Sequence, residues 1–138
     1  MLLSSQEELV GTVEALLWFA DENGELVSEL RQIPVYEGKT RAESIVDALL
    51  GGSEGELRAL IPEEYEYNSL RIEDGVCYVN LSGEQLPLLG GNEEPALQAL
   101  AKSLCSLDTV DSVRYLVDGE SVFRYGVAVI EDSFSMQE

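Results

Sequence analysis

The sequence contains no histidine, and this absence removes the side chain most often used as a general base and as a zinc ligand. It also excludes Ser–His and Cys–His nucleophile arrangements. The two cysteines, Cys77 and Cys105, form no CxxC pair and cannot supply a four-ligand metal site. Carboxylates are so numerous that adjacent pairs such as Glu63–Glu64 occur by chance and are poor evidence for general acid–base catalysis. We therefore expect a protein that is not an enzyme and that uses no cofactor or metal ion.

Positive charge is also scarce, because 8 Lys and Arg residues stand against 27 Asp and Glu residues. The formal net charge of −19 repels the phosphate backbone of nucleic acids and anionic lipid surfaces. The same charge favours basic partners or cations. We expect no nucleic-acid partner.

Long apolar runs are missing as well. No stretch approaches the roughly 20 apolar residues of a membrane-spanning helix, and residues 1–5 lack the features of a signal peptide. Either the protein stays inside the cell or its targeting segment is absent from this chain. The 138 residues, 45% of them hydrophobic, predict a single domain over residues 1–138 with an ordered core at about 12–134.

The first part of the chain predicts a β-hairpin. Strand-forming residues fill 12–20, the pair Asn23-Gly24 suits a tight turn, and residues 25–33 form the returning strand. We expect Trp18 in the core, on the same side of the first strand as Leu16 and Ala20.

Two amphipathic helices are expected further on. The capping box Thr40-Arg41-Ala42-Glu43 begins the first helix, and Gly51-Gly52 ends it. The second helix runs from about residue 93 to residue 107, with Pro95 in its first turn.

Two more hairpins are expected, each built around an Asp-Gly turn. The first pairs residues 69–73 with 76–82 around Asp74-Gly75, and the second begins at residue 112 and turns at Asp118-Gly119. Residues 127–130 form a last apolar strand. The order of elements predicts an α+β fold, with a mostly antiparallel sheet and two helices packed on one face, a two-layer sandwich. The other sheet face is then open to solvent or to a partner.

The two cysteines lie among apolar neighbours, so we expect buried free thiols. A disulfide between Cys77 and Cys105 remains open if the strand and the helix pack face to face in an oxidising compartment.

Three tyrosines are candidates for contact with a partner. Tyr65 and Tyr67 stand in an acidic loop after Pro62, where an amphipathic ring can face water and bind. The alternative is that they only pack the loop. Tyr78 alternates with the apolar side chains of its strand and so falls on the mixed face.

Several segments together resemble one known family. Residues 74–82 (DGVCYVNLS) resemble a DG-x-x-YVDLS strand, with Asn80 where aspartate is usual. The helix of the same family resembles residues 96–107. The strand that follows it, which ends in V-D-G, resembles the segment with Val110, Val113 and 116–119. Residues 127–134 (VAVIEDSF) resemble a closing VDLSEPF strand, and 48–52 and 61–62 fit the segments upstream. The chain resembles the GerMN domain of GerM-type sporulation and germination proteins and of LpqB-type lipoproteins.

The resemblance implies a single GerMN-like domain that serves as a non-catalytic, envelope-associated interaction or assembly domain in a Gram-positive, spore-forming bacterium. The full-length protein would be extracytoplasmic and anchored as a lipoprotein. Its partner would be a protein of the envelope or sporulation machinery, with homo-oligomerisation left open. The alternatives are a peptidoglycan-binding module that uses Tyr65, Tyr67 or Tyr78 and an accessory domain of a cell-wall hydrolase. The family carries over no catalytic, cofactor or metal-binding residue.

Overall fold

A computed structural model describes residues 9–122, 124–126, 128–129 and 134–135 of the chain. Parts of the expected closing strand, Val127 and Ile130, lie outside these residues. The described strands and helices, in chain order, are β1 (Leu9–Ala20), β2 (Leu26–Tyr36), α1 (Arg41–Leu50), β3 (Ser69–Glu73), β4 (Val76–Leu81), the 3-10 helix η2 (Gly83–Leu89), α2 (Glu93–Leu104), β5 (Ser112–Val117), β6 (Arg124–Tyr125), β7 (Ala128–Val129) and β8 (Phe134–Ser135).

The expected α+β fold with mostly antiparallel pairing is confirmed. The strands form a β1–β2 hairpin, a sheet in the order β3-β4-β5-β8, and a small β6–β7 pair. One pair, β4 with β5, is parallel, because η2 and α2 connect the two strands as a crossover.

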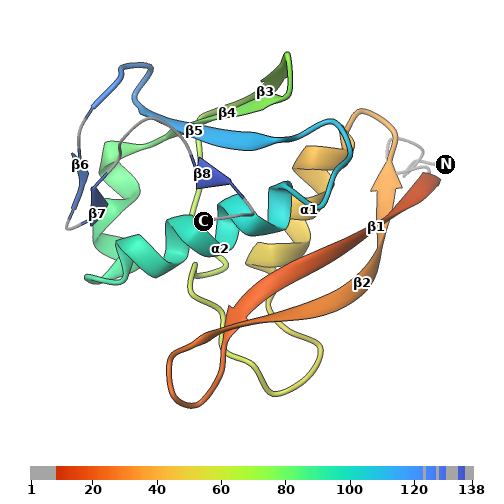
Figure 1. Cartoon of the computed structure of the whole chain (residues 1–138), viewed down its shortest axis with the longest axis horizontal. Coiled ribbons are helices and arrows are strands. Elements are labelled where there is room, and N and C mark those ends of the chain that lie inside the picture. Colours follow the sequence, from red (N-terminus) through yellow and green to blue (C-terminus); the bar gives the residue numbers. More distant parts are fainter. Residues whose placement is uncertain (1–8, 123, 127, 130–133, 136–138) are drawn as a thin grey trace, which may run out of the picture.

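The helices lie between the two larger sheets. Figure 1 shows α1 and α2 on one face of the four-stranded sheet, as predicted, with the β1–β2 hairpin on the far side of the helices. The N-terminal hairpin therefore does not join the four-stranded sheet. Instead, β1 contacts both helices and β2 contacts α1. The outward face of the four-stranded sheet has no described helix above it.

Local sequence signals account for the start of α1 and for the β3–β4 turn. The Thr40 Oγ1 accepts a hydrogen bond from the Glu43 N–H at 3.0 Å, and the Glu43 carboxylate accepts one from the Thr40 N–H at 3.0 Å. This reciprocal pair is the predicted capping box. Asp74 and Gly75 both have positive φ, 52° and 82°, as the tight hairpin turn requires.

The prediction of a third hairpin around Asp118-Gly119 is wrong. The Asp118-Gly119 turn is closed by one bridge between Val117 and Glu120, and β5 pairs instead with β4 and β8. α1 is thus followed by the β3–β4 hairpin, whereas α2 is followed by the single strand β5 of the four-stranded sheet.

Trp18 also differs from expectation, because the other face of β1 enters the core. Val13, Ala15, Leu17 and Phe19 are buried, whereas Trp18 is half-buried on the opposite face. Its ring lies 5.1 Å from the Lys102 ammonium of α2.

The edge of β1 that does not pair with β2 is covered by two serines near the end of α2. Ser106 Oγ accepts from the Leu16 N–H at 2.9 Å and donates to the Leu16 carbonyl at 3.2 Å. Ser103 Oγ accepts from the Trp18 N–H at 3.0 Å and donates to the Ala99 carbonyl. Side chains thus satisfy backbone groups that a neighbouring strand would otherwise pair.

We expect Ser103→Ala to lower the free energy of unfolding by about 1–2 kcal/mol, because it leaves the Trp18 N–H without its acceptor in a buried place. Urea denaturation measures the change. Ser112→Ala, at a half-buried serine for which the described part of the chain shows no side-chain hydrogen bond, is the control. Equal effects of the two substitutions would contradict the edge-capping role.

Candidate interaction surface

The outward face of β3, β4 and β5 presents three rows of side chains. Strand register places residues of one row directly beside each other on adjacent strands. The rows are Glu73, Val76 and Ser112; Arg71, Tyr78 and Arg114; and Ser69, Asn80 and Leu116.

The middle row places an aromatic ring between two arginines. The Arg71 guanidinium carbon lies 4.4 Å from the centroid of the Tyr78 ring, within cation–π range. Arg114 is the register partner of Tyr78 on β5, and its side chain is exposed. Arg71 Nε also lies 3.1 Å from the Glu73 carboxylate, but both side chains are more than half exposed, so this ion pair contributes little.

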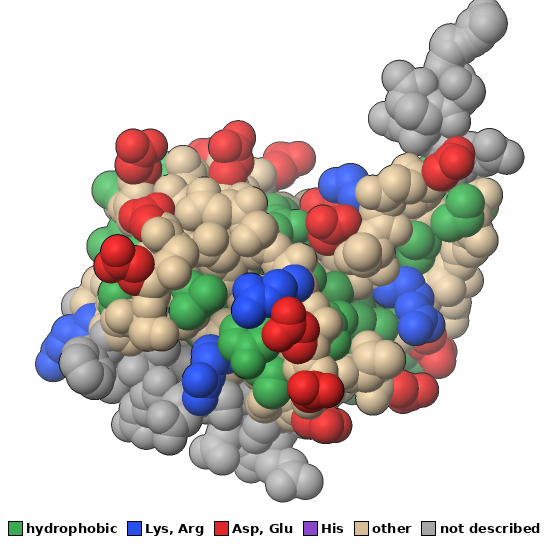
Figure 2. All heavy atoms as spheres, turned by 90° about the horizontal axis from the view of Figure 1, so that it is seen from above, with side chains coloured by type: hydrophobic (Ala, Val, Ile, Leu, Met, Phe, Trp, Pro, Cys, Tyr) green, Lys and Arg blue, Asp and Glu red, His purple; other side chains and the backbone are tan. Residues whose placement is uncertain are grey.

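Two of the eight basic residues of the chain therefore flank one tyrosine. Figure 2, which looks down on the molecule from this side, shows basic and hydrophobic side chains close together near the centre, with acidic side chains around them. This face is a locally basic and aromatic area on an acidic protein.

Tyr65, for which the sequence left open a partner contact or a packing role in the loop, is buried. Its hydroxyl lies 2.8 Å from that of Tyr125, and the Tyr125 hydroxyl donates to the Ser82 carbonyl. Tyr65 therefore donates to Tyr125. Burial and this hydrogen bond raise the pKa of Tyr65. The burial of the ring fits the packing alternative.

Tyr67 is half-buried and packs against the hydrophobic core. Burial, together with the nearby carboxylates of Asp47 and Glu43 on α1, raises the pKa of Tyr67 to about 12. The structure thus separates the three candidate tyrosines, and only Tyr78 belongs to the open sheet face.

Sequence reasoning missed Arg71 and Arg114 as partners of Tyr78. The alternation within SLRIE and SVRYLV places each arginine opposite the core-facing residues of its own strand. Their shared row depends on the parallel β4–β5 pairing, which no local pattern indicates.

Both cysteines are free thiols in the structure. Cys77 is buried, and burial, followed by the influence of Cys105, raises the pKa of the Cys77 thiol to about 12. Cys105 is half-buried.

We expect a thiol reagent at neutral pH to modify Cys105 in the folded protein and to leave Cys77 unmodified until unfolding, because the thiolate is the reactive form and needs access. Mass spectrometry of Cys105→Ser and Cys77→Ser variants assigns each site. Rapid modification of Cys77 in the Cys105→Ser variant would contradict the buried position.

In the described segments, no group of three or more His, Cys, Asp or Glu side chains is arranged to hold a metal ion. No helix among these residues is long and apolar enough to span a bilayer.

A comparison with known protein families identifies the family of this chain. The family model described as "Germane: Sporulation and spore germination" matches residues 16–123, more than half of the sequence. The chain belongs to this family. Membership confirms the GerMN resemblance seen in the motifs and links the domain to sporulation and germination at the level of the family. No protein with a curated description matches the sequence.

Solved structures share the fold of this Germane domain. The first GerMN domain of the sporulation protein GerM from Bacillus subtilis superposes with a TM-score of 0.75 at 21% identity, covering 91% of this chain and 99% of that one. The tandem GerMN domains of the same protein give 0.71 at 21% identity, covering 92% of this chain and 47% of the tandem chain. A candidate lipoprotein from Clostridium perfringens gives 0.60 at 21% identity, covering 94% and 91%.

Proposed function

We propose that this chain is a non-catalytic interaction domain of an envelope-associated sporulation complex, and that it docks a protein partner on the outward face of β3, β4 and β5. The observation that carries the proposal is the Arg71–Tyr78–Arg114 row on a sheet face that no described helix covers. Family membership supports the sporulation setting.

The residue types in this row suit a binding surface. Tyrosine and arginine are enriched among the residues that dominate the free energy of protein association. The two guanidiniums favour a partner carboxylate, which the rest of an acidic surface would repel. We therefore infer an acidic contact on the partner at this face.

We further propose an extracytoplasmic, lipid-anchored location for the full-length protein, supported by the fold it shares with a candidate lipoprotein. The start of the full-length gene tests this. A lipobox cysteine upstream of Met1 is expected, and a continuous cytoplasmic domain in its place would contradict the location.

A photo-crosslinking residue in place of Ser112, on the sheet face, tests the docking in the native host during sporulation. We expect one defined crosslinked protein. Combining Tyr78→Ala with Arg114→Ala should reduce the crosslink yield about tenfold or more, because both anchors are lost. Arg41→Ala, an exposed arginine on α1, is the matched control and should leave the yield unchanged. Equal yields from both variants, at unchanged unfolding midpoints, would remove this face as the docking site.

Peptidoglycan is the second candidate ligand, favoured by the arginine stacked on an accessible tyrosine ring. Such a platform can contact a sugar ring and the carboxylates of a peptide stem. It would also suit an accessory domain of a cell-wall hydrolase. Sedimentation with purified peptidoglycan separates this candidate from protein docking. Loss of the domain from the supernatant, reversed by Tyr78→Ala, is expected if the glycan is the ligand.

A further inference from the structure

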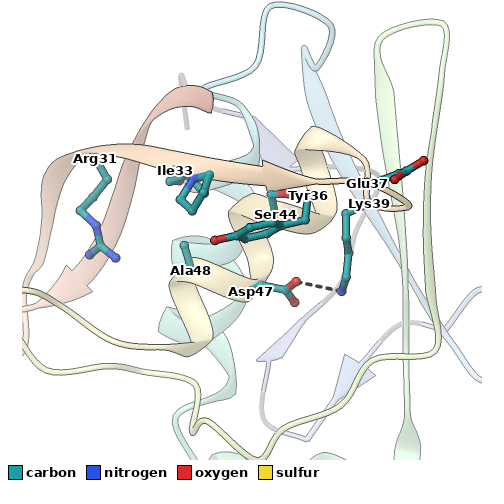
Figure 3. Close-up of a pocket in the computed structure, with 9 residues that line it drawn as sticks. Arg31, Ile33, Tyr36, Glu37, Lys39, Ser44, Asp47 and Ala48 are labelled. Atoms are coloured by element: carbon teal, nitrogen blue, oxygen red, sulfur yellow. Dashed lines mark hydrogen bonds and ion pairs between the residues drawn. The ribbon is translucent and has the colours of Figure 1, made fainter. Parts of the chain in front are cut away.

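A groove of about 570 Å³ lies between β2 and α1, remote from the sheet face discussed above. Its upper wall is β2 from Arg31 to Tyr36, and its lower wall is α1 from Ser44 to Ala48 (Figure 3). The volume falls within the range of about 300–1,000 Å³ that is common for ligand sites.

The edge of β2 along this groove has unpaired backbone. Within the described part of the chain, residues 26–35 make backbone hydrogen bonds only to β1. On the opposite edge of the same hairpin, the second half of β1 is occupied, because Ser106, Ser103 and Arg58 bond to the backbone of Leu16, Trp18 and Ala20. Among the described residues, the outward backbone groups of Ser28, Leu30 and Gln32 on β2 are available to an additional strand, and Pro34 offers only its carbonyl, because proline has no N–H. An exposed edge recruits extended peptides.

The groove has an apolar section for a side chain of such a strand. Ile33 and Pro34 contribute apolar surface from β2, and Ala48 contributes it from α1. The Tyr36 side chain extends from the strand toward α1, near Ala48 and Asp47 (Figure 3). Since side chains of a strand alternate, every second residue of a bound peptide would point into this section.

The charges around the groove favour a basic occupant. Arg31 lies 2.6 Å from Glu29 and 3.4 Å from Glu54, so two carboxylates surround one guanidinium. Lys39 lies 2.9 Å from Asp47. Glu37 adds a further carboxylate at the end of β2, and the whole chain carries −19. The basic side chains at the groove are thus neutralised, and negative charge remains.

We propose that the groove between β2 and α1 binds an extended, basic peptide segment of a partner protein, added as a strand along β2. Apolar residues of the segment enter between Tyr36 and Ala48, and its lysine or arginine side chains meet the carboxylates of Glu37 and Glu54 at the two ends of the groove. A second copy of this chain is a poor occupant, because each copy carries a charge of −19.

Fluorescence anisotropy with a labelled peptide of alternating lysine and valine tests the proposal at about 0.15 M salt. Ala48→Phe fills the groove without a change of charge and should weaken binding about tenfold or more. Ala59→Phe, at an exposed alanine outside the groove, is the matched control and should bind as the wild type does. If Ala48→Phe impairs folding, Tyr36→Ser at the exposed rim replaces it.

Backbone chemistry separates strand addition from general charge attraction. The same peptide with alternate backbone nitrogens methylated keeps its charge but cannot pair with β2, so its affinity should fall by a similar factor. NMR shift changes should centre on residues 31–36. Equal binding of the methylated peptide, equal binding of both phenylalanine variants, or shift changes centred on β3 to β5 would each overturn the proposal. So would a concentration-dependent dimer that Ala48→Phe abolishes, because the occupant would then be a second copy.

Discussion

Replacing Tyr115 with alanine is expected to lower the free energy of unfolding by about 3–5 kcal/mol, the largest change that we expect from a single substitution. The residue lies on β5 and is only 2% exposed. Its hydroxyl donates to the Leu97 carbonyl of α2. Truncation removes the buried ring, leaves a cavity and deletes a contact between the two layers.

Chemical denaturation measures this loss, and Tyr115→Phe divides it into two parts. The phenylalanine variant keeps the ring but removes the hydrogen bond to α2, so we expect a loss of only about 1 kcal/mol. Tyr36→Ala, at a tyrosine that is 40% exposed, should change stability by no more than about 0.5 kcal/mol. A loss below about 1.5 kcal/mol for Tyr115→Ala would show that the sheet and α2 are not held together in this way.

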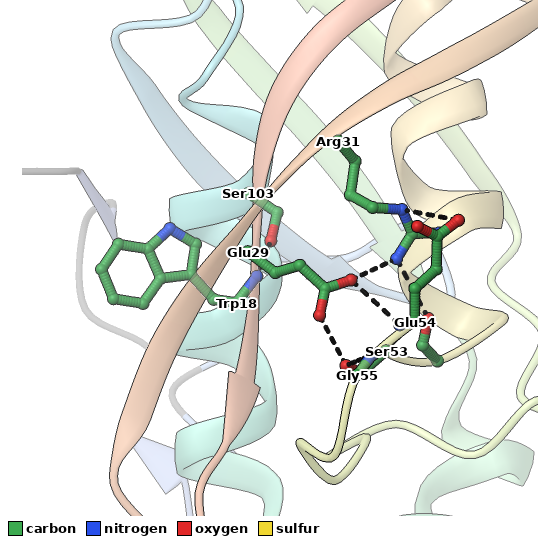
Figure 4. A network of polar contacts seen from close by, with 8 residues as sticks. Trp18, Glu29, Arg31, Ser53, Glu54, Gly55 and Ser103 are labelled. Carbon is green, nitrogen blue, oxygen red and sulfur yellow. Dashed lines mark hydrogen bonds and ion pairs between the residues drawn. The ribbon is translucent and has the colours of Figure 1, made fainter.

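Replacing Glu29 with glutamine is expected to cost about 1–3 kcal/mol, because this carboxylate joins β2 to the loop after α1 (Figure 4). It accepts hydrogen bonds from the Ser53 hydroxyl, from the Glu54 N–H at 3.0 Å and from the Arg31 guanidinium at 2.6 Å. Glutamine retains one acceptor oxygen but places an amide donor where the second carboxylate oxygen accepted.

The effect of Glu29 should depend on pH in a defined direction. Burial alone would raise the pKa of the carboxyl, but the hydrogen bonds from Glu54 and Ser53 and the charge of Arg31 outweigh it and lower the pKa from 4.5. A lowered folded-state pKa means that this stabilisation is complete above the unfolded value and is lost as pH falls through the folded value.

Unfolding free energies of the wild type and of Glu29→Gln should therefore differ most at neutral pH and converge well below pH 4.5. Glu22→Gln, at an exposed carboxylate in the β1–β2 turn, is the control and should track the wild type throughout. A constant difference between wild type and Glu29→Gln down to strongly acidic pH would contradict the lowered pKa.

The sequence correctly predicted the start of α1 and the β3–β4 turn, because interactions between neighbouring residues determine these features. The Thr40 capping box and the Asp74-Gly75 turn each involve residues within four positions of one another, so a short segment contains the whole cause. The Asn23-Gly24 turn is of the same kind, with Asp21 accepting the Asn23 and Glu25 N–H groups.

Features that depend on distant partners were not predictable in this way. The buried Tyr65 is hydrogen-bonded to Tyr125, 60 positions further along the chain, and the acidic residues around Tyr65 left both a surface contact and a packing role open. Likewise, the candidate surface needs Arg114 beside Tyr78, which follows only from the parallel pairing of β4 and β5. Trp18 shows the same limit, because apolar residues occupy both faces of β1 and alternation alone does not choose the inner one.

The parallel alignment of β4 with β5 also has a consequence for the order of folding. The β3–β4 hairpin closes over a tight turn, and such hairpins form within about 1–10 µs. Pairing β4 with β5 brings Val76 to Ser112 and must first close a long loop that contains η2 and α2. That closure costs chain entropy before any contact of the parallel pair offsets it. The refolding rate of this domain should therefore be governed by the docking of α2, and not by any of its turns.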